Sequence, residues 1–143
     1  MKSIAITWTL LLGSFAVLAQ TPIDKLQQTN SDYLKKMESE GYGFRSQIIT
    51  EFNPENAEQN VNIKLKAGHT YQLVAISDSD VKSLDLEVKS MKTHSIKSLV
   101  VPEVSGAVKE LKTEKSGKFK IVLNVAEFSN AGQGFVSFMV LRK

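Results

Sequence analysis

The spacing of apolar residues changes close to residue 43, from a helical period to a period of two. Before that point one apolar stripe recurs at helical spacing, made of Ile23, Leu26, Tyr33, Leu34 and Met37. Thr21 is a suitable N-cap, Pro22 suits the first helical position, and Asp24 completes a capping box. The glycines of EGYG, residues 40–43, end the pattern. Residues 20–42 are therefore predicted to form a helix, either packed on the rest of the chain or presented to a partner. The stripe favours packing.

Residues 43–143 alternate apolar and polar positions, which predicts short β-strands. The last strand is apolar on both faces, which is typical of a central strand. Turn signals separate the expected strands, which lie at 46–52, 61–66, 70–77, 84–90, 98–102, 108–113, 118–125 and 135–142. The pattern predicts a mainly β protein: an antiparallel β-sandwich of about eight strands, jelly-roll-like, preceded by one N-terminal α-helix.

The first 19 residues have the features of a secretory signal peptide. Lys2 is the positive charge, residues 4–17 are an apolar run, and Ala16 and Ala19 allow cleavage after Ala19. The run is shorter than the roughly 20 residues that a membrane span needs, so cleavage is favoured over a retained anchor. The absence of cysteine excludes disulfides, thiolate metal sites and lipoprotein anchoring. We expect a bacterial periplasmic or secreted protein with no stable membrane span after cleavage.

The charge of the chain argues against nucleic-acid binding. The formal net charge is only +3, and removal of Lys2 with the signal lowers it by one. Arg45 and Arg142 are the only arginines, and the lysines alternate with apolar residues as on a solvated sheet face.

The order of strands and turns resembles the bacterial pre-peptidase C-terminal (PPC) domain over residues 60–143. The matching positions are Gly68, Tyr71, Asp78, Asp80, Leu84, Asp85, Leu86, Ser116, Gly117 and Ile121, whereas Phe119 stands where that family usually has tyrosine. The resemblance implies a non-catalytic β-sandwich of the kind appended to exported enzymes, some of which bind calcium or insoluble substrates. No enzyme domain accompanies the sandwich in this sequence, so we expect a stand-alone copy whose fold is implied more securely than its function.

Asp78, Asp80 and Asp85 are candidate calcium ligands because three carboxylates lie within eight positions. No EF-hand glutamate or loop glycine accompanies them, and calcium needs six to eight oxygens. The alternative is that Asp78 and Asp80 form an Asx-type turn and that Asp85 is the polar position of a half-buried strand. We favour the turn.

No motif in the sequence predicts an enzyme. His69, expected to face solvent in a tight turn, and His94 have no neighbours at metal-ligand spacing. Nucleophile-elbow and phosphate-loop patterns are also absent from the sequence. We therefore expect no catalytic residues and no cofactor apart from the calcium candidate.

Two function classes are favoured, and a third is a weaker alternative. The first is an exported binding protein for an envelope protein or other envelope component. The second is a carbohydrate-binding module, calcium-assisted if the aspartates hold the ion. Its sugar-stacking candidates are Tyr42, Phe44, Phe52 and Phe128, because Trp8 would leave with the signal. The GYGF segment also fits a hydrophobic plug between helix and sandwich, which we favour. The third is an inhibitor or chaperone acting on a separate enzyme.

Overall fold

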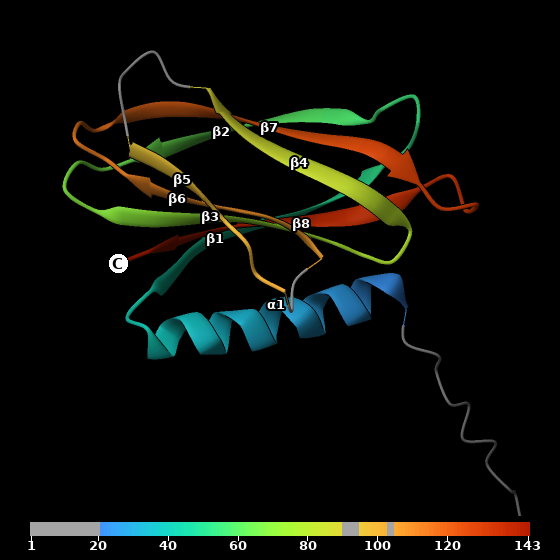
Figure 1. The fold of residues 1–143 in the computed structure, drawn as a ribbon, viewed down its shortest axis with the longest axis horizontal. Coiled ribbons are helices and arrows are strands. Elements are labelled where there is room, and N and C mark those ends of the chain that lie inside the picture. The colour runs from blue at the N-terminus through green and yellow to red at the C-terminus, as the bar shows by residue number, and fades with distance from the viewer. Residues whose placement is uncertain (1–20, 90–94, 103–104) are drawn as a thin grey trace, which may run out of the picture.

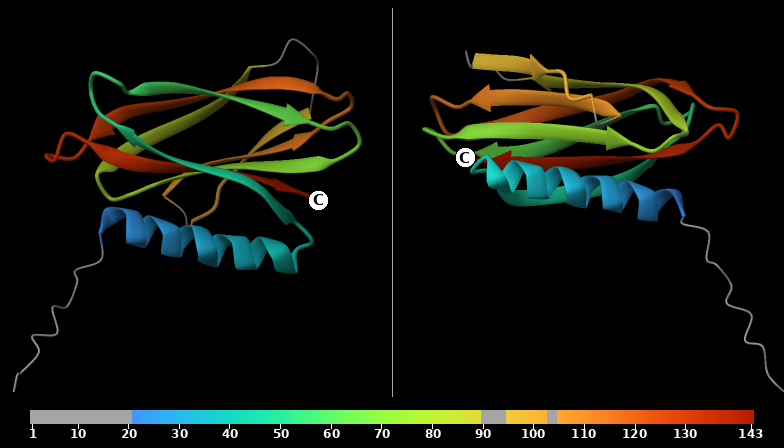
Figure 2. Two further views of the ribbon diagram at one scale, coloured as in Figure 1. Left: turned by 180° about the vertical axis from the view of Figure 1, so that it is seen from behind. Right: turned by 60° about the horizontal axis from the view of Figure 1, so that its bottom comes forward.

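In the part of the chain that the structure describes, eight strands form two antiparallel sheets that stack face to face, and one helix lies against the outer face of the larger sheet (Figure 1). The computed structural model describes residues 21–89, 95–102 and 105–143, so the expected signal peptide and His94 lie outside the described residues. Figure 2 shows the three layers from two further directions. The elements are α1 Pro22–Ser39, β1 Gly43–Phe52, β2 Glu58–Leu65, β3 Thr70–Ser77, β4 Val81–Lys89, β5 Ser95–Leu99, β6 Gly106–Lys112, β7 Gly117–Phe128 and β8 Gly134–Arg142.

The strand order confirms the predicted jelly-roll-like sandwich. One sheet has the order β1-β8-β3-β6-β5 and the other β2-β7-β4. Successive strands alternate between the sheets except at β5 and β6, which form a hairpin within the larger sheet. As predicted, the last strand is central: β8 pairs with both β1 and β3.

Helix α1 begins and ends where the sequence predicts. Asp24 N–H donates to Thr21 Oγ1 (3.2 Å) and Thr21 N–H donates to Asp24 Oδ2 (3.1 Å), which is a complete capping box. The hydrogen bonds from Thr21 lower the pKa of the Asp24 carboxyl because they favour its charged form. At the other end, Gly41 takes a positive φ of 94°, which ends the helix at low steric cost. Among the described residues, no helix is long and apolar enough to cross a membrane.

The helix packs on the sandwich rather than standing free. Tyr33 Oη donates to Gln72 Oε1 (2.7 Å), and both residues are buried. The apolar contacts between helix and sheet join Leu26, Tyr33, Met37, Tyr42, Val74, Ile76, Val108, Met139 and Leu141. Strand β3 is consequently buried on both faces: Leu73 and Ala75 face the core between the sheets, whereas Val74 and Ile76 face the helix.

Several predicted strand boundaries are wrong. Strands β1 and β4 begin three residues earlier than predicted, at Gly43 and Val81, and β7 ends three residues later, at Phe128. Strand β5 was expected at 98–102 but spans Ser95–Leu99, because its register pairs Ser95 with Lys112 and Leu99 with Val108. Val101, which gave the segment its strand-like pattern, packs instead against the helix-side cluster. Strand β2 begins at Glu58 rather than residue 61, because its pairing with β7 continues to Asn124.

One close backbone approach fixes the start of β6. A Cβ at Gly106 would lie 1.8 Å from the carbonyl oxygen of Ala75. Only glycine fits there without displacing β3, its neighbour in the sheet.

Candidate functional site

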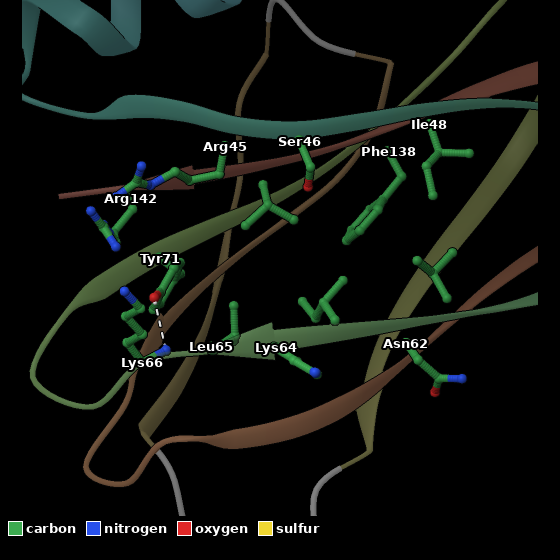
Figure 3. A pocket seen from close by; sticks show the side chains of 13 residues that line it. Arg45, Ser46, Ile48, Asn62, Lys64, Leu65, Lys66, Tyr71, Phe138 and Arg142 are labelled. Carbon is green, nitrogen blue, oxygen red and sulfur yellow. Dashed lines mark hydrogen bonds between the residues drawn. The ribbon is translucent and has the colours of Figure 1, made fainter.

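A cleft opens between β1 and β2, the edge strands of the two sheets on one side of the sandwich (Figure 3). Its volume is about 430 Å³, which is within the range of small-molecule sites. We call it the sheet-edge cleft. Its lining residues are Arg45, Ser46, Ile48, Val61, Asn62, Ile63, Lys64, Leu65, Lys66, Tyr71, Phe138, Val140 and Arg142.

A β-bulge in β1 turns Arg45 into this cleft. Phe44 pairs with Leu141 and Ser46 pairs with Val140, so Arg45 is an extra residue with no partner in β8. Without a bulge, Arg45 and Ser46 would point to opposite faces of the sheet. Here both line the cleft, while Phe44 lies on the helix side. Bulges commonly re-aim a side chain next to functional sites.

Among the described residues, four positively charged side chains and no acidic one line the cleft. Arg45 and Arg142, the only arginines of the chain, come from opposite ends of the sequence and meet here through the pairing of β1 with β8. Lys64 and Lys66 come from β2 and its end. Among residues 21–89, 95–102 and 105–143, no carboxylate forms an ion pair with any of these four side chains. The described lining of the cleft therefore has an excess of positive charge, carried by exposed or half-buried side chains.

Three of the four cations lie toward one end of the cleft, whereas Lys64 lies further along β2 (Figure 3). Arg142 pairs with Gly43 in β1 and with Tyr71 in β3, so these positions share one end of the sandwich. Ile48 pairs with Phe138 further along the same strands. Figure 3 accordingly places Arg45, Arg142, Tyr71 and Lys66 toward one end and Ile48 and Phe138 toward the other.

The charged end is held in place by the fold. Tyr71 is buried, and its Oη accepts a hydrogen bond from the backbone N–H of Lys66 (2.9 Å). This bond ties the end of β2 in the small sheet to the start of β3 in the large sheet. Arg45, Arg142 and Tyr71 lie on strands and Lys66 directly follows one, which favours a fixed geometry at the charged end.

The three candidate calcium ligands do not gather into a metal site. Asp78 is buried, and its Oδ1 accepts from Asp80 N–H (3.0 Å), as in an Asx turn. Its Oδ2 accepts from Phe135 N–H (2.8 Å). Asp80 Oδ1 accepts from Ser129 Oγ (2.7 Å). Asp85 is exposed on β4, where its Oδ1 accepts from Leu86 N–H.

In the part of the chain that the structure describes, no three His, Asp or Glu side chains form a group that could hold a metal ion. Calcium binding stays a prediction, and the observed hydrogen bonds favour the turn.

The aromatic candidates for sugar stacking, and His69, differ in how far their rings are exposed. Phe52 and Tyr42 are buried, so neither offers a stacking surface. Phe128 packs partly against the core between the sheets. Phe44 is 46% exposed and is the only residue of the four with an open ring. His69 was expected to face solvent but is half-buried, with its ring edge-on to Tyr71 at 6.1 Å.

Phe44 borders a second hollow, of about 380 Å³, between α1 and β1. We call it the helix groove; its lining residues are Gln27, Asn30, Ser31, Leu34, Phe44, Gln47 and Met139. Asn30 Nδ2 (2.8 Å) and Gln47 Nε2 (3.1 Å) both donate to Ser137 Oγ. Ser137 is buried beneath the groove, whose own described lining offers amides, the Ser31 hydroxyl group and the exposed Phe44 ring, with no charged side chain.

Comparison with known proteins adds no family assignment: no family model, curated protein or solved structure matches this chain. The PPC resemblance therefore stays a prediction, and the site has to be interpreted from its own geometry.

Sequence reasoning missed the sheet-edge cleft. It noted Arg45 and Arg142 only as too few for nucleic-acid binding, and it placed Lys64 and Lys66 on a solvated face. The scarcity of arginine was the one available signal, because two arginines in a lysine-rich chain can both belong to one site. Their meeting depends on strand pairing and on a bulge, neither of which the alternation pattern contains.

Proposed function

We propose that this protein is an exported, non-catalytic binding protein that holds an anionic, partly apolar ligand in the sheet-edge cleft. The observation that carries the proposal is the combination of apolar walls with four cations that have no ion-pair partner among the described residues. The signal-like N-terminus supports export, and the lack of a recognisable catalytic motif in the sequence supports binding rather than catalysis.

Two guanidinium groups suit an anion better than two lysines would. Arginine presents several N–H donors in a planar fork that matches carboxylate and phosphate oxygens. Unpaired like charges close together repel each other, so a bound anion would relieve that repulsion as well as form hydrogen bonds. Sites of this kind use a few polar groups for orientation and apolar walls for most of the contact.

The test is binding of anilinonaphthalene sulfonate, a dye with one anionic group and an apolar ring system, to the folded protein. We expect saturable fluorescence enhancement that the double variant Arg45→Gln/Arg142→Gln loses by at least tenfold in affinity. The matched control is Lys82→Gln/Lys89→Gln, which removes the same charge from the exposed face of β4 and should bind the dye normally. Equal loss in both double variants would mean only a general charge effect and would overturn the proposal.

A second candidate function is carbohydrate binding in the helix groove. Amide and hydroxyl groups beside an exposed aromatic ring are suited to hydrogen bonding with, and stacking on, a neutral sugar. This version needs no calcium. A glycan array should then give hits that Phe44→Ala abolishes and that persist in chelator, whereas Arg45→Gln should leave them unchanged. An array without reproducible hits would reject this candidate.

A further inference from the structure

We propose that the ligand of the sheet-edge cleft is a single-chain anionic amphiphile: one carboxylate or phosphate head on one alkyl chain. This inference rests on the proposed function and adds the class of ligand. It follows from the placement of three of the four cations, Arg45 and Arg142 among them, toward one end of the cleft and of Ile48 and Phe138 toward the other (Figure 3).

The charged end fits a compact anionic head. Arg142 lies in register with Gly43 and Tyr71, and the bulge brings Arg45 to the same end of the sandwich. Lys66 follows directly after β2 and lines the same end. Three cations around one end can neutralise a carboxylate or a phosphate, and they disfavour a cationic or uncharged head, which would leave them unpaired.

The apolar end fits one alkyl chain. Its apolar residues come from both sheets and are Ile48, Val61, Ile63, Phe138 and Val140, with Asn62 and Lys64 of β2 beside them. Ile48 is 46% exposed, although its partner in register, Phe138, is buried, so the floor of the cleft is packed while one wall is open. A bound chain would cover that exposed apolar surface. The volume of about 430 Å³ is near the lower end of the range for ligand sites, which favours one chain over two.

Other ligand classes use only part of this cleft. A small polar dianion would contact the arginines but would leave the apolar wall uncovered. A neutral sugar would leave all four cations unpaired. An amphiphile with its head at Arg45 and its chain toward Phe138 contacts both ends at once.

The experiment is displacement of anilinonaphthalene sulfonate from the full-length protein by soluble probes below their micelle concentration. The probes are acetate, octanoate, dodecanoate, dodecyl phosphate, dodecyltrimethylammonium and dodecyl maltoside. We expect dodecanoate and dodecyl phosphate to displace the dye, with affinity rising up to about fourfold for each methylene added between octanoate and dodecanoate. Stronger binding of the carboxylate would indicate a fatty acid, and stronger binding of the phosphate a lipid phosphate.

Two single variants separate head from chain. Arg45→Gln should reduce dodecanoate affinity about tenfold while leaving the dependence on chain length intact. Ile48→Ser, on the exposed part of β1, should instead flatten the dependence on chain length. Circular dichroism should show the same fold in both variants.

Equal displacement by dodecanoate and dodecyl maltoside would overturn the assignment of an anionic head. Equal affinity for octanoate and dodecanoate would overturn the assignment of an alkyl chain. Either result, with dye binding still dependent on the two arginines, would leave the proposed function standing. If the double variant Arg45→Gln/Arg142→Gln bound the dye as tightly as the parent, the proposed function and the ligand class would both be overturned.

Discussion

Replacing Asp78 with alanine tests whether the aspartate loop is a turn or a metal site. The Asp78 carboxylate accepts two backbone hydrogen bonds, from Asp80 N–H at 3.0 Å and from Phe135 N–H at 2.8 Å. It lies at a crowded corner, where a Cβ on Gly134 would come within 2.8 Å of Asp78 Oδ1. The carboxylate therefore ties the β3–β4 turn to the start of β8.

The magnitude follows from those two bonds. A hydrogen bond to a charged group contributes about 1.5–3 kcal/mol, and a buried donor left without a partner adds a desolvation cost. Asp80 and Phe135 are both half-buried, so water can replace part of either bond in the variant. We expect Asp78→Ala to lower the free energy of unfolding by about 2–4 kcal/mol. Asp78→Asn, which keeps one acceptor oxygen, should cost about half as much. Asp85→Ala, on an exposed strand position, should stay within about 0.5 kcal/mol of the parent.

Urea unfolding in excess calcium and in excess chelator decides between the two interpretations. A turn predicts the same order of stabilities in both conditions, with Asp78→Ala lowest. A calcium site predicts instead that calcium stabilises the parent by about 2.7 kcal/mol at a hundred times its dissociation constant, and that both variants lose this gain. Calcium-dependent stabilisation abolished by Asp85→Ala would refute our reasoning, because that carboxylate has no part in the turn.

Three further predictions concern the fold. Gly106→Ala should cost more than about 3 kcal/mol in urea unfolding or prevent folding, because its Cβ would overlap the backbone of β3, whereas Gly117→Ala, with open space around it, should be nearly neutral. Leu26→Ala should cost about 2–4 kcal/mol in a single cooperative transition if the helix and sandwich unfold together; a cost below about 0.5 kcal/mol would show that the helix is a separate unit. Burial, and next the negative charge of Glu110, raise the pKa of the Tyr42 phenol; the stability that this provides is present below the ordinary tyrosine pKa of about 10 and is lost as pH rises through the raised value. Tyr42→Phe should therefore flatten the alkaline decline of the unfolding midpoint, and an unchanged decline would contradict this.

The predictions that held depend on residues close together in sequence. Thr21 and Asp24 are three positions apart, and both partners of the capping box lie in that short segment. The apolar content of residues 135–142 on both faces identified a central strand without knowledge of its neighbours, because a strand buried on both sides has no polar face.

The predictions that failed, or that were not made, depend on contacts between distant residues. The predicted position of β5 was wrong because Val101 packs against the helix-side cluster and takes no part in strand pairing. An apolar residue in the sequence does not show which of these contacts it makes. The Asp78 turn was anticipated as an alternative, but its bond to Phe135, 57 positions away, was not.

By itself, the sequence determined the helix, most of the strands and the sandwich class, because backbone periodicity and local capping act over a few residues. Only the tertiary structure decided that Arg45 and Arg142 meet at the end of an apolar cleft. Their proximity requires β1 to pair with β8 across almost the whole chain and a bulge to insert one unpaired residue at Arg45. Pairing and bulge follow from the packing of the complete core, and no local pattern encodes them.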